Sequence, residues 1–388
     1  MSDDVVVSSA VGPPAVRRAR ADRFVFLDLL RAIAVCLVMY SHVVGIFLHQ
    51  HGEDSVLAGG LQGFTAHPLA LALRMGNFGV VLFFLVSGFV VTHTGFAERP
   101  RQYAVKRLLR IYPMLAVSVL LAAVLLLADL HPVTTAGKIT TVTPATVVTN
   151  MTLANHLIAP PVLLVDVSWT LVIEVLFYTL LLAALPLLRR RVWPVICGEL
   201  ALVAVVMATE HLGGASYFLF GVNVSYLPAL LLGQVVWAVW SRRVPLWAGV
   251  AFGAAAVAEY VWAGDPGMGR DDHPFDVHLL IGFAVFVLAL LAERRLRPTR
   301  LVGYLADRSY SLYLLHGLLG FAVLSLLYPL IGYPGALVAG VTATFLGAEA
   351  GYRWVERPSM RLARRLARRW NGTRAISSGQ LAREAHRQ

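Results

Sequence analysis

Residues 24–48, FVFLDLLRAIAVCLVMYSHVVGIFL, form an apolar stretch of membrane-spanning length. A helix needs about 20 mostly apolar residues to cross a bilayer, so this stretch predicts a first transmembrane helix from Phe24 to Leu48. The stretch also carries Asp28, Arg31 and His42. Because ionisable groups inside a membrane are costly and by default functional, this helix is expected to do more than anchor the chain.

Arg31 and His42 are predicted to share one face of this helix. Ten residues separate them in the sequence, an offset close to three whole turns at ~100° per residue, and the rise of ~1.5 Å per residue places them roughly 16 Å apart. A cation near the cytoplasmic end and an imidazole near the far end indicate a site that runs through the membrane. Two structural alternatives stay open. Arg31 could simply pair with Asp28 one turn earlier, and His42 could be a satisfied interior or interfacial histidine.

The composition is that of a membrane protein. Of 388 residues, 58% are hydrophobic and only 14% are charged, and the mean hydropathy is +0.69. These values exclude an ordinary soluble enzyme and predict an all-α, polytopic integral membrane protein. Cys36 and Cys197 both lie in apolar runs, so neither a disulfide framework nor a thiolate metal site is expected.

The remaining apolar runs predict about ten transmembrane helices in total. Residues 1–23 are expected to form a disordered, basic N-terminus, residues 24–357 the transmembrane domain, and residues 358–388 a basic tail that is disordered at its end. Residues 131–168 contain proline breaks and predict an external loop with a short lid or re-entrant piece. The further spans are expected near 77–94, 111–130, 169–188, 193–209, 224–240, 246–262, 277–292, 309–330 and 335–354.

The basic residues follow this topology. With both termini in the cytoplasm, the external loops hold only Arg74, Lys138 and Arg270, and nearly all other basic residues lie in cytoplasmic segments. This positive-inside bias explains the net charge of +11 without a nucleic-acid partner. In the tail, Leu362, Leu366 and Trp370 fall on one helical face among arginines. That pattern predicts an interfacial helix on the inner leaflet, with a soluble basic tail as the alternative.

Five stretches, in order, resemble the acyltransferase-3 family of integral membrane O-acyltransferases. The first is FLDLLRAIAVCLVMYSH, with its arginine, ten residues, then histidine. The resemblance covers residues 24–357, with Thr170 in place of the family's usual serine. The other four stretches are GVVLFFLVSGF (79–89), RLLR (107–110), SWTLVIEVLFY (168–178) and SYSLYLLHG (309–317).

The resemblance implies transfer of an acyl group, often acetyl, from cytoplasmic acyl-CoA to a hydroxyl group. The acceptor would be a sugar of a cell-surface glycan or glycolipid, or the sugar or macrolide part of a natural product, and the enzyme would lie in a bacterial plasma membrane. It also implies that Arg31, His42, Arg107, Arg110 and Glu174 are the functional positions.

The residue chemistry suggests a role for each position. Arg31, Arg107 and Arg110 lie toward the cytoplasmic side, where planar guanidinium groups suit the donor's phosphates, although a positive-inside flank would also explain the last two. His42 is predicted to deprotonate the acceptor hydroxyl or, alternatively, to carry the acyl group itself. Glu174, expected near the depth of His42, is predicted to set the imidazole tautomer.

Asp28, Trp169 and His316 are predicted to support the site. Asp28 would position Arg31, Trp169 belongs to the fourth family stretch, and His316 would lie beside the donor path or pack structurally. No metal is expected, because no set of ligands has a convincing spacing. A proton-coupled transporter is the main alternative, since the same ionisable residues could form a substrate path. Transporters usually have two related halves, and no such repeat is visible here.

Overall fold

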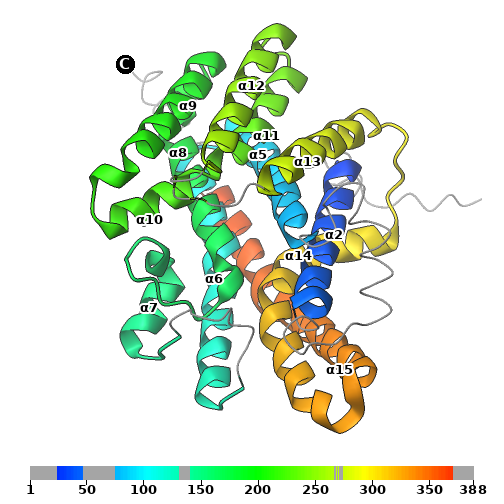
Figure 1. Cartoon of the computed structure of the whole chain (residues 1–388). Helices are drawn as coiled ribbons and strands as arrows, with labels where there is room; N and C mark the ends of the chain where they lie inside the picture. The colour runs from blue at the N-terminus through cyan, green and yellow to red at the C-terminus, as the bar shows by residue number, and fades with distance from the viewer. Residues whose placement is uncertain are drawn as a thin grey trace, which may run out of the picture.

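The computed structural model describes residues 24–46, 75–130, 140–265, 268, 270 and 274–369. These residues form helices joined by turns, with no β-strand among them, so the predicted all-α class is confirmed. Figure 1 shows the helices gathered into one bundle. The α-helices are α2 (Val25–Tyr40), α5 (Met75–Ala97), α6 (Pro100–Leu127), α7 (Pro144–Thr152), α8 (Trp169–Leu188), α9 (Val192–Thr209), α10 (Ala215–Val224), α11 (Leu227–Trp240), α12 (Leu246–Trp262), α13 (Pro274–Leu291), α14 (Arg300–Leu315) and α15 (Phe321–Gly351).

Seven helical segments of the described residues are long and apolar enough to cross a membrane, and two shorter apolar helices accompany them. The last long segment, Arg300–Arg369, is kinked at Gly332, which has φ 69° and ψ 174°. Glycine adopts this backbone region at little cost, and Pro329 and Pro334 flank the break. The polytopic membrane fold is confirmed, while the number of ten crossings and the cytoplasmic termini stay predictions.

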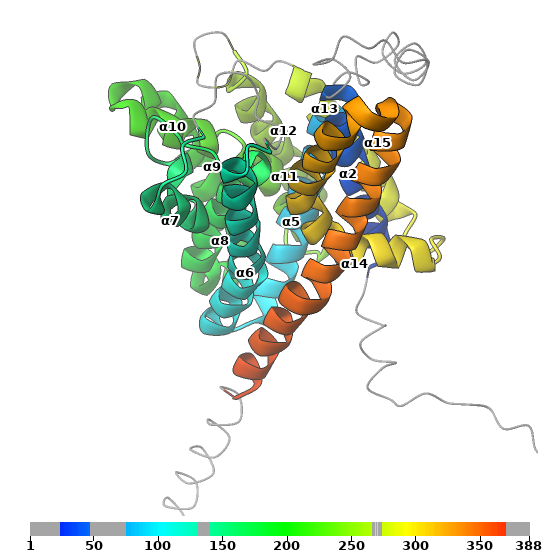
Figure 2. The same ribbon diagram turned by 90° about the horizontal axis from the view of Figure 1, so that it is seen from below.

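Helix α5 forms the centre of the bundle and packs against α2, α8, α11 and α13 (Figures 1 and 2). Its crossing with α11 is very close because glycine lies on both sides. A Cβ atom on Gly88 would meet the carbonyl group of Leu230, and a Cβ atom on Gly233 would meet that of Leu85. Small residues let transmembrane helices approach closely and gain van der Waals contact. The close contact with α11 therefore fixes the position of α5 in the bundle.

A carboxylate from the loop after α13 caps the first helix. The backbone N–H groups of Val25 and Phe26 donate to the two carboxylate oxygens of Glu293, at 2.9 and 2.8 Å. The first N–H groups of a helix lack intrahelical partners, and the positive end of the helix dipole favours a negative charge there. Glu293 thereby fixes the start of the helix that carries Arg31.

Three helices contain a π-helical turn: η1 (Ser41–Ile46) continues α2, η6 (His316–Gly320) continues α14, and η7 (Tyr352–Glu356) continues α15. Such turns are rare and often occur at functional sites. His42, His316 and Glu356 lie in these three turns, one in each. The even α-helical periodicity assumed from the sequence therefore does not continue past Tyr40 in the first span.

The predicted loop 131–168 contains a short helix, α7, in its described part. Thr143 accepts a hydrogen bond from the backbone N–H of Thr146 at 3.1 Å and so caps this helix. Asn150 ties α7 to the following segment, because its amide donates to the Val162 carbonyl at 2.9 Å and accepts from the Leu164 N–H at 3.0 Å. The described part of this loop thus contains the short folded piece that the sequence predicts, and its position relative to the membrane stays a prediction.

Residues 357–369 continue the last segment as a helix, called here the C-terminal arm. Figure 2 shows the orange-red C-terminal helix running beside α6 at the lower end of the bundle. Ala363 and Ala367 are buried, and the side-chain amide of Gln102 in α6 donates to the Ala367 carbonyl at 2.9 Å. Leu362 is exposed. The arm thus packs against protein on one face, and its contact with the inner leaflet stays a prediction.

Several predicted features lie outside the described residues, namely the N-terminus, the end of the first span, the first external loop, two of the external basic residues and the end of the tail. They are residues 1–23, 47–48, 49–74 including Arg74, Lys138, and 370–388 including Trp370.

Candidate active site: an arginine cavity and a histidine pair

Arg31, Arg107, Arg110 and Glu174 line one internal cavity of about 90 Å³, called here the arginine cavity. The structure thus brings together four of the five principal site residues predicted from the sequence. The same cavity contains polar residues that the sequence analysis did not single out, although all of them lie in the stretches quoted for the family resemblance. These residues are Ser87, Tyr178, Ser309, Tyr310 and Tyr313.

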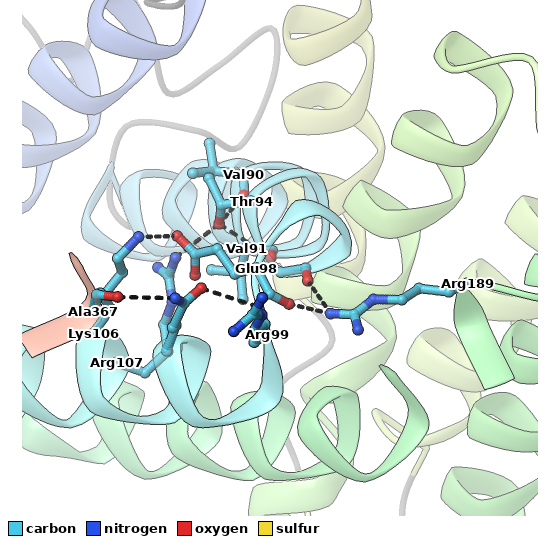
Figure 3. Close-up of polar contacts among 11 residues, drawn as sticks. Val90, Val91, Thr94, Glu98, Arg99, Lys106, Arg107, Arg189 and Ala367 are labelled. Atoms are coloured by element: carbon cyan, nitrogen blue, oxygen red, sulfur yellow. Dashed lines mark hydrogen bonds and ion pairs between the residues drawn. The ribbon is translucent and has the colours of Figure 1, made fainter. Parts of the chain in front are cut away.

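Arg107 is positioned by neutral groups and has spare hydrogen-bonding capacity. Its Nη2 donates to the Thr94 hydroxyl at 2.7 Å (Figure 3). Its guanidinium lies 5.4 and 5.7 Å from the ring centroids of Tyr103 and Tyr178. Its Nε is buried and has no hydrogen-bond partner among the described residues. A buried, unsatisfied donor on a cation is costly unless a ligand completes it, and an anion would do so.

Arg110 is paired with a carboxylate that the sequence analysis missed. Its Nη1 forms an ion pair with Glu356, whose other oxygen accepts from Ser311 at 2.9 Å. The Arg110 guanidinium also lies 5.0 Å from the ring centroid of Tyr310. Glu356 is 4% exposed. It follows the last predicted span at the edge of a basic tail, where nothing in the local pattern indicates an inward-facing carboxylate.

Arg31 enters the arginine cavity from α2. Its guanidinium shares the cavity with those of Arg107 and Arg110 and with the carboxylate of Glu174. Asp28 forms no ion pair with Arg31 within the described part of the chain. Among the described residues Arg31 therefore has no direct counter-ion, and the simple pairing considered for Asp28 and Arg31 is not seen there.

Glu174 bonds to hydroxyl groups rather than to His42. Its two oxygens accept from the Ser87 hydroxyl at 2.6 Å and from the Tyr178 hydroxyl at 3.0 Å. Among the described residues, these two are the hydrogen bonds of the Glu174 carboxylate. The structure therefore does not place Glu174 in contact with His42, as the prediction that it sets the His42 tautomer requires. The prediction failed because it did not include the rotation of α8 about its own axis. Depth along a helix can be counted from the sequence, but the direction of Glu174 around α8 depends on how that helix packs.

His42 instead lies beside His316. The two ring centroids are 4.9 Å apart, with the planes at 69°. His42 Nδ1 is 2.9 Å from the Val38 carbonyl, and His316 Nδ1 is 3.2 Å from the Leu312 carbonyl. A carbonyl only accepts, so each of these contacts places a proton on the Nδ1 atom of its ring. Backbone carbonyls thus do what Glu174 was expected to do.

His316 is fully buried, and its Nε2 has no hydrogen-bond partner among the described residues. An unsatisfied acceptor in such a place is unfavourable until a donor approaches it. The ring of His42 packs on this buried ring, with the centroids 4.9 Å apart. The two histidines are called here the histidine pair.

Tyr313 lies between the arginine cavity and the histidine pair. It lines the cavity, and its ring centroid is 6.0 Å from that of His316 and 5.7 Å from that of Phe83. The Tyr313 hydroxyl is 2.8 Å from the Thr170 hydroxyl. The threonine that replaces the family's usual serine therefore still supplies a hydroxyl. Trp169 does not line the cavity; it packs on Tyr226 with a centroid distance of 5.1 Å.

A second, larger cavity lies beside the first, at the N-terminal end of α6. Its volume is about 540 Å³, and it is called here the vestibule. Arg31, Arg107 and Arg110 line both cavities and so form the boundary between them. The other charged residues of the vestibule are Glu98, Lys106, Asp307, Glu356, Arg357, Arg361 and Arg364.

A helical membrane bundle with ionisable groups on an internal cavity defines a class of integral membrane enzymes and transporters, and the sequence comparisons decide between them. Residues 24–352 match the profile of the acyltransferase domain of the acyltransferase-3 family, and the chain belongs to this family. The predicted resemblance is thereby confirmed.

Two relatives connect the chain to particular proteins. The exopolysaccharide production protein ExoZ of Rhizobium meliloti (strain 1021) is 31% identical over 207 residues, which cover 51% of this chain and 62% of ExoZ. Nodulation protein 10 of Rhizobium leguminosarum bv. viciae is 38% identical over 93 residues, which cover 24% of this chain and 22% of that protein. The matches therefore span less than two thirds of each relative. No solved structure matches the chain.

Proposed function

We propose that this protein is a membrane O-acyltransferase that moves an acyl group from acyl-CoA to a hydroxyl group of a carbohydrate. The observation that carries the proposal is the meeting of the family stretches at one place. Arg31, Ser87, Arg107, Glu174 and Tyr310 come from five different stretches and line one cavity. A scaffold with no ligand would gain nothing from placing three guanidinium groups there, because burying them is costly.

The donor would enter through the vestibule. Its phosphates would bind at the boundary formed by Arg31, Arg107 and Arg110, where Arg107 Nε has no hydrogen-bond partner in the described part of the chain. Guanidinium groups suit this task since they offer several donors in a plane and stay charged. The thioester arm would then extend past Tyr313 and Phe83 toward His42. Donor and acceptor would in this way meet inside the membrane.

In the proposed reaction, His42 Nε2 takes the proton of the acceptor hydroxyl while the oxygen attacks the thioester carbonyl. The new C–O bond forms, the C–S bond breaks, and the thiolate leaves with the proton returned by His42. His316 would stabilise the intermediate state, because its unpaired Nε2 can accept a hydrogen bond from protonated His42. Direct acylation of His42 is the alternative mechanism. We prefer the general-base mechanism because it gives His316 Nε2 a role as a hydrogen-bond acceptor.

Glu174 would act on the donor side. Its bonds to Ser87 and Tyr178 hold two hydroxyl groups at the wall of the arginine cavity. It lines the same cavity as Arg31 and Arg110, and its negative charge would offset part of their positive charge. Glu174 is therefore proposed to shape the cavity around the thioester arm rather than to take part in proton transfer.

The acceptor is proposed to be a sugar of a cell-surface polysaccharide or a related glycolipid. Support comes from the relative whose name refers to exopolysaccharide production, which is aligned over about half of this chain. The enzyme is placed by this proposal in a bacterial inner membrane, consistent with seven long apolar helices in the described residues.

Thiol release from acetyl-CoA by the purified protein in nanodiscs tests the proposal, with an extract of host glycolipids and polysaccharide as acceptor. Wild type should release thiol and label the extract, while folded His42→Ala should bind acetyl-CoA without transfer. Absence of acetyl-CoA binding and transfer by wild type would overturn the proposal and favour a transporter.

A further inference from the structure

The C-terminal arm forms a wall of the vestibule that none of the family stretches includes. Arg357, Arg361 and Arg364 lie on one side of this helix, at spacings of four and three residues, and all three line the vestibule. Residues three or four positions apart on a helix are neighbours on its surface. Arg365 and Arg368 on the same arm are exposed and do not line the vestibule.

The arm is fixed in this position by contacts with protein. Ala363 and Ala367 are buried, and the Gln102 amide of α6 donates to the Ala367 carbonyl at 2.9 Å. Figure 3 shows Ala367 on the red ribbon of the arm, beside Lys106 and Arg107 of α6. The arginines of the arm therefore face the arginines of α6 across a defined space.

The vestibule carries an excess of positive charge. Seven cationic side chains line it against three carboxylates, an excess of four. Two of those carboxylates are already used, because Glu98 pairs with Lys106 at 2.6 Å and Glu356 pairs with Arg110. Arg357, Arg361 and Arg364 make no ion pair or hydrogen bond with any described residue. Cations that face one another across a space without counter-ions favour an anionic ligand.

Coenzyme A carries a diphosphate and a separate 3′-phosphate, in total roughly three to four negative charges. A volume of about 540 Å³ lies within the range of about 300–1,000 Å³ that is usual for small-molecule sites. If the diphosphate binds at the boundary arginines, as in the proposed function, the 3′-phosphate must lie farther out, on the side of the arm.

We infer that the C-terminal arm is part of the donor site, and that Arg361 and Arg364 recognise the 3′-phosphate of coenzyme A. The inference rests on the proposed function and deepens it, because it assigns to this arm the distinction between coenzyme A and smaller thioesters. Arg357, nearer the boundary, serves both phosphate positions. The same arginines could face phosphate groups of anionic lipids instead, and the experiment separates the two sources.

The test is the affinity of the full-length protein in phosphatidylcholine nanodiscs for coenzyme A and for dephospho-coenzyme A, which lacks the 3′-phosphate. The double variant Arg361→Gln/Arg364→Gln is compared with Arg365→Gln/Arg368→Gln, which removes the same charge from the same helix. The first pair should weaken coenzyme A binding roughly 10-fold or more and abolish the preference over dephospho-coenzyme A. The second pair should keep both affinity and preference.

Two results would overturn the inference while leaving the proposed function intact. One is a preference for coenzyme A that survives Arg361→Gln/Arg364→Gln; the other is an equal loss in both double variants, which indicates general electrostatics. Coenzyme A binding that is unaffected, with weaker association of the first double variant with phosphatidylglycerol vesicles, would assign the arginines to lipid. Failure of wild type to bind either nucleotide would instead contradict the proposed function itself.

Discussion

The arginine cavity and the histidine pair lie on either side of Tyr313 and are built in opposite ways. The cavity gathers charge: Arg31, Arg107 and Arg110 face it with a single lining carboxylate, Glu174. In the histidine pair, by contrast, each ring directs its Nδ1 atom to a backbone carbonyl. The first arrangement suits an anion that arrives from solvent, and the second suits a proton that moves within the protein. In the proposed function, this difference corresponds to a division of labour between donor binding and chemistry.

The strongest test of this division is His42→Ala. Loss of a general base should lower the rate of acyl transfer by about 10²–10⁴. Coenzyme A affinity should not change, because His42 does not line the arginine cavity. Thiol release and nucleotide binding, measured on the same nanodiscs, give both values. His211→Gln, at an exposed position, is the control. A folded His42→Ala protein with wild-type turnover would remove the histidine pair from the reaction.

Arg107→Lys should produce the reverse pattern. Lysine keeps the charge but loses the planar guanidinium and its Nε donor, which has no partner among the residues that the structure describes. The KM for acetyl-CoA should rise roughly 10- to 100-fold with a smaller change in kcat. Initial-rate kinetics over a range of donor concentrations measure the two constants. Arg190→Lys, at an exposed arginine in the turn after α8, is the control. An unchanged KM in Arg107→Lys would argue against phosphate binding there.

His316 allows a finer test within the pair. His316→Phe keeps an aromatic ring but removes the acceptor, and the rate should fall roughly 10-fold with the donor KM unchanged. His316→Gln supplies an amide oxygen and should recover part of that loss. The two variants distinguish a chemical role from a structural one. If His316 only fills space, phenylalanine should be tolerated at least as well as glutamine, because it is the better apolar replacement for a buried ring.

The smallest expected effect concerns stability rather than chemistry. Glu293→Gln should lower the free energy of unfolding by about 1 kcal/mol, since the cap of α2 loses its charge but keeps one amide oxygen. A thermal unfolding curve in detergent measures the change. Asp265→Asn removes an exposed carboxylate and should leave the curve unchanged. Equal stability of the two variants would mean that the contact with Glu293 contributes nothing to holding the first helix.

The sequence predicted the fold class and the gathering of the arginines, because hydropathy and charge are local properties. It did not predict the partner of Glu174, since the rotation of α8 is set by packing against Ser87 of α5. Glu356 was missed because its partner Arg110 is 246 positions away. The π-helical turns that carry His42 and His316 were also missed, since the estimate of one shared face assumed regular α-helix throughout.

The Glu293 cap has a consequence for biogenesis. The first helix enters the membrane long before the carboxylate that completes its start is made, because Val25 and Glu293 are 268 positions apart. At synthesis rates of about 5–20 residues per second, this delay is roughly 10–60 s. During that time the helix must be protected by the insertion machinery or by partial contacts with early spans. Arg31 is therefore expected to reach its final position only after Glu293 has been synthesised. Until then, quality-control proteins that recognise unassembled transmembrane helices can bind this one.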